Sequence, residues 1–192
     1  PVGERELRRL GARPAVNAVI KYLAALQPDD RDRGIKDIEN WARNHGLAVH
    51  AVEPEWDRFS GTPRALIPQV LLLDVGKSSP PDGYDAHLIC WWQFDRASKQ
   101  EHFYWQTFFS ADEIEHGLSR DHGLLKARLV FNSVHGAPEM GVFFDTAAWG
   151  SGSPIPTYYL YRLEGQQWRV VWRAPAAGNL WRGVHGTAEF TG

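Results

Sequence analysis

The spacing of apolar residues changes once along the chain. Between Pro14 and Gly46 they recur at every third or fourth position, which is the period of an amphipathic helix. The Asp-rich segment 29–32 divides this region, and Gly46 follows the second stripe at a position where helices often end. We therefore expect a helical hairpin over residues 14–46. The stripes are Val16, Val19, Ile20, Leu23 and Leu26 in the first helix, and Ile35, Ile38, Trp41 and Ala42 in the second.

The rest of the chain has the pattern of strands. Apolar residues alternate with polar ones or form short continuous runs, as strands require. A capping box at Ser110–Glu113 predicts one short helix near residues 111–117. The expected strands are 47–52, 70–75, 86–94, 101–109, 125–131, 140–144 and 183–190, in addition to the pair described next.

The clearest hairpin signal spans residues 158–173. Two runs of aromatic and β-branched residues flank a short polar turn at residues 164–167. Alternation should place Tyr159, Tyr161 and Leu163 on one face of the first strand. It should likewise place Trp168, Val170 and Trp172 on one face of the second, and we expect that face to cover the helices. The hairpin is therefore predicted to be central to the scaffold, with its rings mostly buried.

This order of elements favours an α+β fold. Helices come first and hairpin-linked strands follow, which is typical of a helical hairpin packed on a large, mostly antiparallel sheet. At 192 residues the chain fits a single domain over 1–192, with a β-rich part over 65–192. Because it begins with Pro1 and its strand-like pattern continues to the end, we expect a fragment of a longer protein.

The composition limits the possible partners. A formal net charge of −2 gives no basic surface for phosphates, so we expect no nucleic-acid partner. No apolar stretch approaches the roughly 20 residues that span a bilayer, so we expect no membrane insertion. The one cysteine, Cys90, lies in an apolar strand and should be buried. These totals leave the oligomeric state open, and the absence of disulfides does not settle the compartment. We expect the domain to belong to a secreted or cell-envelope protein of a bacterium.

The sequence assigns no catalytic residue, metal or cofactor. The segment Gly76-Lys77-Ser78 lacks the upstream glycine of a phosphate-binding loop. The possible ligands Asp112, Glu113 and His116 have no second such group to complete a metal site. Five of the eight histidines precede glycine, where a turn explains them. The chain therefore leans away from an enzyme.

Two short segments resemble each other. Trp92-Gln93-Phe94-Asp95 and Tyr161-Arg162-Leu163-Glu164 each end a strand just before a turn, and a glutamine follows each turn. A second echo, at His135-Gly136 and His185-Gly186, has a different separation. The echoes therefore indicate similar hairpins rather than a repeated unit.

Tryptophans in loops are the remaining candidates for function. Trp149 and Trp181 lie in segments rich in glycine or flanked by polar residues, and such rings can stack on a sugar or a protein side chain. The candidate ligand-binding residues are Trp149, Tyr158, Trp181, Arg182 and His185. We expect a non-catalytic module whose aromatic surface contacts carbohydrate or another protein domain. One alternative is a small-molecule or enzymatic domain with an apolar pocket between helices and curved sheet, and another is a purely structural domain.

One observation should distinguish these alternatives. Trp91 and Trp92 are adjacent in a predicted strand, so their rings must point to opposite faces. The binding-platform hypothesis expects the outward ring, and the loop tryptophans, to be exposed. The enzymatic alternative expects a histidine and a carboxylate within hydrogen-bond reach in a deep pocket.

Overall fold

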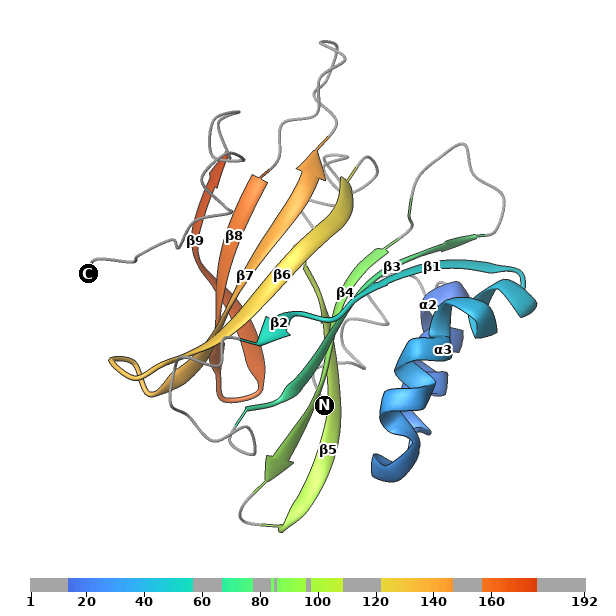
Figure 1. Cartoon of the computed structure of the whole chain (residues 1–192), viewed down its shortest axis with the longest axis horizontal. Helices are drawn as coiled ribbons and strands as arrows, with labels where there is room; N and C mark the ends of the chain where they lie inside the picture. Colours follow the sequence, from blue (N-terminus) through green and yellow to red (C-terminus); the bar gives the residue numbers. More distant parts are fainter. Residues whose placement is uncertain are drawn as a thin grey trace.

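The computed structural model describes residues 14–56, 67–77, 84, 86–95, 98–108, 122–146 and 157–175. These residues form two helices, a short 3-10 turn and nine strands (Figure 1). The helices are α2 (Pro14–Ala24) and α3 (Arg31–Asn44), with η1 (Pro28–Asp30) between them. The strands are β1 (Leu47–Val52), β2 (Glu55–Trp56), β3 (Gln69–Lys77), β4 (Ala86–Asp95), β5 (Gln100–Thr107), β6 (His122–Asn132), β7 (Ala137–Thr146), β8 (Thr157–Glu164) and β9 (Gln167–Pro175).

The two predicted helices are present, and their apolar stripes are buried except for Leu26 and Trp41, which are partly buried. Val16, Val19 and Leu23 of α2 have no exposed surface, and neither do Ile38 and Ala42 of α3. Helix α3 ends as the sequence predicts. The residue after its C-cap, Gly46, has φ +69°, which a residue without a Cβ adopts at little cost.

The strands divide into two sheets rather than the one large sheet expected. One has the order β1-β3-β4-β5 and the other β2-β6-β7-β8-β9. All neighbours pair antiparallel except β2, which lies parallel to β6. The α+β class and the mostly antiparallel pairing are confirmed. The predicted short helix near 111–117 and the strand over 183–190 lie outside the described residues.

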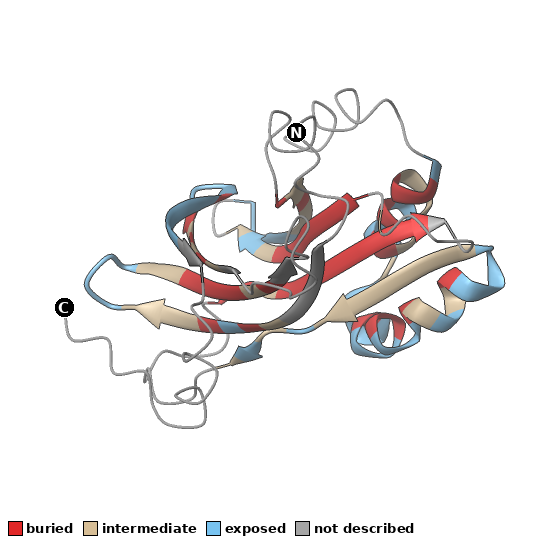
Figure 2. Cartoon of the chain, turned by 90° about the horizontal axis from the view of Figure 1, so that it is seen from above, coloured by how far each residue is buried: buried red, intermediate tan, exposed pale blue. Residues whose placement is uncertain are grey.

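The four-stranded sheet is the middle layer. On one face, Leu71 and Leu73 of β3 and Leu88 of β4 pack with the helices. On the other face, Leu72 and Ile89 pack with the five-stranded sheet. A strand covered on both faces carries apolar residues on both, which explains the run Val70–Leu73 and Val75; the polar residue between them, Asp74, is itself buried. Figure 2 shows this burial: buried residues are concentrated in the strands, and exposed residues lie on the outer sides of the helices.

The hairpin at 158–173 forms as β8 and β9, but it is not central. Gly165, with φ +64°, begins the predicted turn between the paired residues Glu164 and Gln167. Strand β9 ends the strand order of its sheet. The hairpin also does not cover the helices, because the four-stranded sheet lies between them (Figure 1).

A β-bulge breaks the predicted alternation in β9. Leu160 pairs with Trp172 and Tyr161 pairs with Val170, so Val171 has no opposite residue in β8. An extra residue moves everything after it to the other face of the sheet. Trp168 is therefore buried between the sheets while Trp172 is 52% exposed, so the prediction of a shared face is wrong. Tyr159, Tyr161 and Leu163 are buried, as expected.

Candidate functional site

A groove of about 1080 Å³ opens where the turns of three hairpins meet, and we call it the inter-sheet groove. The hairpins are β4–β5, β6–β7 and β8–β9, whose turns all point toward the lower end of Figure 1. Among the described residues, its aromatic lining is Trp92, Phe94, Tyr104 and Phe131, and its polar lining includes Asp32, Gln69, Gln93, Asp95, Glu101 and Gln166. This mixture of rings with amide and carboxylate groups is typical of a ligand site.

The four rings differ in how much of their surface a ligand can reach. Phe94 is 56% exposed, whereas Trp92 is buried and the other two are half-buried. Tyr104 is held in place because its ring stacks on Trp91, with 5.5 Å between centroids and 22° between planes. Phe94 is therefore the most accessible ring of the groove, and Tyr104 is a pre-positioned one.

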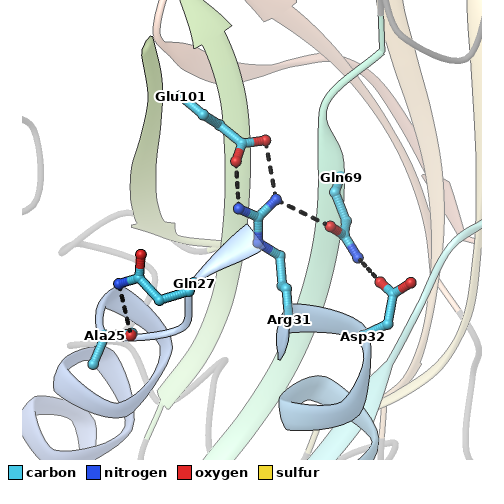
Figure 3. Close-up of polar contacts among 6 residues, drawn as sticks. All are labelled: Ala25, Gln27, Arg31, Asp32, Gln69 and Glu101. Carbon is cyan, nitrogen blue, oxygen red and sulfur yellow. Dashed lines mark hydrogen bonds and ion pairs between the residues drawn. The ribbon is translucent and has the colours of Figure 1, made fainter. Parts of the chain in front are cut away.

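An ion pair connects helix α3 to the groove wall (Figure 3). Arg31, the first residue of α3, donates two hydrogen bonds to the Glu101 carboxylate of β5, one of them 3.0 Å long. It also donates to Gln69 Oε1 at 3.3 Å, and Gln69 Nε2 donates to Asp32 at 2.9 Å. The guanidinium carbon of Arg31 lies 4.8 Å from the centre of the Trp92 ring. The wall is thus organised by a cation held between a carboxylate and an aromatic face.

The hairpin turns supply the remaining polar groups. Asp95 accepts hydrogen bonds from the Ser98 backbone N–H at 3.3 Å and the Ser98 hydroxyl at 2.8 Å. Gln166 Nε2 donates to the Tyr104 hydroxyl at 3.0 Å, which joins the β8–β9 turn to the other sheet. Burial, with a smaller contribution from Asp95, raises the pKa of Tyr104. A tyrosine hydroxyl is protonated at neutral pH even with its ordinary pKa, so the Tyr104 hydroxyl carries a hydrogen that it can donate.

Tyr158, the one described member of the predicted site, does not line this groove. It lies on the outer face of the five-stranded sheet, with its ring centre 4.6 Å from that of Phe143 and 5.6 Å from that of Trp172. Burial and the charge of Glu139 raise its pKa, and Arg128 partly opposes them. The other candidates, Trp149, Trp181, Arg182 and His185, lie outside the described residues.

The adjacent tryptophans do not form an exposed platform. Trp91 and Trp92 point to opposite faces, as predicted, but both are buried because both faces of the sheet are covered. The expectation of an outward, exposed ring at this position is wrong.

The sequence did not identify the groove residues as a site, although two similar strand ends in it contribute to the groove. The echoed segments ending in Phe94-Asp95 and Leu163-Glu164 are strand ends of two different hairpins. Phe94, Asp95 and Leu163 all line the groove. The similarity of these strand ends was visible in the sequence, but their meeting depends on how the two sheets pack.

A histidine and a carboxylate do lie within hydrogen-bond reach elsewhere. Asp74 of β3 and His87 of β4 are paired across the strands and face the space between the sheets. Neither side chain has exposed surface, and neither lines the inter-sheet groove. The pair has the orientation of an acid–base dyad, but its burial keeps it from solvent, so we treat it as an internal polar contact.

Comparison with known proteins assigns the chain to no family. No family model matches it, and searches of curated proteins and of solved structures find no match. Among the residues that the structure describes, no helix has the length and apolarity needed to cross a membrane. In the same part of the chain, no group of three or more metal-ligating side chains is found.

Proposed function

We propose that this protein is a non-catalytic module that binds an oligosaccharide in the inter-sheet groove. The observation that carries the proposal is that Phe94, a ring with more than half its surface exposed, lies in the same groove as Gln93, Asp95 and the Tyr104 hydroxyl. A sugar ring presents apolar C–H groups on its faces and hydroxyls around its edge. Aromatic faces and side-chain amides or carboxylates match these two kinds of surface.

The dimensions of the groove support a ligand larger than one sugar. Its volume of about 1080 Å³ is at the upper end of the range for small-molecule sites. Its walls come from both sheets and from helix α3, and hydrogen bonds link them at Arg31–Glu101 and Gln166–Tyr104. A site whose walls are already fixed loses less conformational entropy when it binds a ligand.

The experiment is a screen of oligosaccharides by thermal shift, followed by calorimetric titration of the hits. The test variant is Phe94→Ala, and the matched control is Trp172→Ala, which removes a ring of similar exposure, 52% against 56%, outside the groove. Phe94→Ala should weaken binding about tenfold, or about 1.4 kcal/mol. Trp172→Ala should leave the affinity unchanged. Equal losses in both variants, or a screen without a hit, would refute the proposal.

A further inference from the structure

We propose that the oligosaccharide bound in the inter-sheet groove carries N-acetyl groups, and that Gln93, Tyr104 and Gln166 hold one acetamido group. This inference rests on the function proposed above and names its ligand class. It comes from three neutral polar side chains whose hydrogen-bonding capacity is only partly used, and from the apolar residues that the other sheet adds to the same groove.

Gln93 and Tyr104 lie on the same face of the four-stranded sheet. The Tyr104 ring stacks on that of Trp91, and Trp91 Nε1 donates to Gln93 Oε1 at 3.4 Å. Trp91 lies opposite Tyr104 in the register of β4 and β5, whereas Gln93 lies opposite His102. Gln93 and Tyr104 are thus diagonal neighbours, with about 7–8 Å between Cα atoms, a separation that long side chains can bridge. One ligand group can therefore contact both.

The three polar side chains have unused donors and acceptors. Gln93 accepts from Trp91 through its oxygen, and no acceptor for its amide hydrogens is found among the described residues. The Tyr104 hydroxyl accepts from Gln166 Nε2 at 3.0 Å, and its own hydrogen has no acceptor in this part of the chain. Gln166 is exposed, and no described residue donates to its Oε1 atom. Together they offer two donor groups and one acceptor.

An acetamido group presents the complementary set. Its carbonyl oxygen has two lone pairs, its nitrogen carries one hydrogen, and its methyl group is apolar. The Gln93 amide and the Tyr104 hydroxyl can donate to the carbonyl while Gln166 accepts from the N–H. Three apolar residues from the other sheet line the same groove and can receive the methyl group: Phe131, Pro138 and Leu163. A sugar hydroxyl can form some of these hydrogen bonds, but it brings no apolar group to that wall.

The proposed contact uses no charge. Asp32 and Glu101 belong to the helix side of the groove, where Arg31 neutralises Glu101. Asp95 accepts two hydrogen bonds from Ser98 of its own turn and takes no part in the contact. The affinity should therefore depend on hydrogen bonds and on burial of the methyl group, so added salt should leave it nearly unchanged.

The test compares oligomers of equal length and linkage made from N-acetylglucosamine, glucosamine and glucose, titrated by calorimetry into the protein at neutral pH. The three share one backbone and differ in a single substituent on each ring. We expect the N-acetylated oligomer to bind at least about tenfold more tightly than the other two. A peptide with acetylated lysines is included, because it carries the same acetamido group without a sugar.

The first variant is Tyr104→Phe, which removes the hydroxyl but keeps the ring that stacks on Trp91. It should weaken binding of the N-acetylated oligomer about tenfold and that of the glucose oligomer less than about twofold, because only the acetamido group needs this donor. The control is Tyr158→Phe, which removes the hydroxyl of a half-buried tyrosine that does not line the groove. It should change neither affinity.

The second variant is Gln93→Glu. It keeps an oxygen that can accept from Trp91 but replaces the amide donor with a carboxylate, which repels the carbonyl oxygen of the ligand. The preference for the N-acetylated oligomer over the glucose oligomer should disappear. Gln27→Glu adds the same charge at an exposed position outside the groove and should leave the preference unchanged. Urea unfolding confirms that each variant is folded.

The outcomes separate the two proposals. Equal binding of the N-acetylated and glucose oligomers, tighter binding of the glucosamine oligomer, or an unchanged preference in both test variants would overturn the inference and leave the oligosaccharide site standing. Binding of the acetylated peptide alone, or of none of these probes, would also overturn the inference; if the wider screen is without a hit as well, the proposed function falls with it.

Discussion

The Nδ1 atom of His87 lies 2.6 Å from the Oδ1 atom of Asp74, and neither side chain reaches solvent. The two residues face each other across β3 and β4, so the sheet itself fixes their approach. The His87 ring also meets Phe144 of the other sheet edge-on, with 6.0 Å between centroids. Both side chains have lost contact with water on burial, and the hydrogen bond between them offsets part of that cost.

Removal of His87 should therefore destabilise the fold strongly. We expect His87→Ala to cost about 3–5 kcal/mol, because it leaves the Asp74 carboxylate buried without this partner. The free energy of unfolding in urea measures the change. The double variant Asp74→Ala with His87→Ala should cost less than the sum of the two single variants. The control is His135→Ala, a change at an exposed histidine in the β6–β7 turn, and additive costs in the double variant would contradict this coupling.

The Arg31–Glu101 pair should matter for stability more than the surface pair Arg33–Asp30 at the start of the same helix. Arg31 has 7% of its side chain exposed and Glu101 29%, whereas Arg33 and Asp30 are 82% and 59% exposed. We expect Glu101→Gln to cost about 2 kcal/mol, because it weakens hydrogen bonds to a charged group. Asp30→Asn should change stability by less than about 1 kcal/mol. Urea unfolding compares the two, and equal effects would show that the pair does not anchor α3.

A side chain at position 141 should disturb the outer aromatic row. A Cβ atom added to Gly141 would overlap the Tyr158 hydroxyl oxygen, and the Tyr158 ring packs between Phe143 and Trp172. Gly141→Ala should therefore destabilise the protein by about 1–3 kcal/mol. Tyr158→Leu removes the obstructing ring, so Gly141→Ala should cost much less in that background. The thermal midpoint of each variant measures the loss of stability. If Gly141→Ala lowers the midpoint equally in both backgrounds, the overlap with Tyr158 is not its cause.

Cys90 should report global unfolding. The thiol is fully buried between the helices and the four-stranded sheet, and burial raises its pKa. Because the thiolate is the reactive form, the native protein should not react with a thiol reagent at neutral pH. Reaction should begin only as denaturant unfolds the chain, with a midpoint that coincides with the loss of circular dichroism. Complete labelling in native buffer would contradict this placement of β4.

The local elements could be predicted from the sequence because their signals are local. The helical stripes around Val19 and Ile38, the turn at Gly165 and the stop at Gly46 each depend on residues a few positions apart. Most of the apolar side chains in the helical stripes are buried in the structure. The bulge at Val171 was missed because nothing in the run Val170-Val171-Trp172 marks which residue lacks a partner. That residue is determined by the pairing of β9 with β8.

The candidate site was the least predictable part. Loop tryptophans drew attention because rings outside strands are unusual, and four of the five residues chosen lie outside the described part of the chain. The inter-sheet groove instead combines Asp32 of α3, Phe94 of β4 and Gln166 of the β8–β9 turn. No spacing in the sequence brings such residues together.

The sequence by itself determined the class of fold, the order of the two described helices and of the described strands other than β2, the hairpin turns and the burial of Cys90, because periodicity and turn chemistry act over short distances. Tertiary structure alone decided that the strands form two sheets, that the four-stranded sheet separates the 158–173 hairpin from the helices, and that a bulge exposes Trp172. It also decided where a groove opens. These features depend on which apolar faces pack together, and many pairs of faces in one chain are equally apolar, so only the assembled core selects among them.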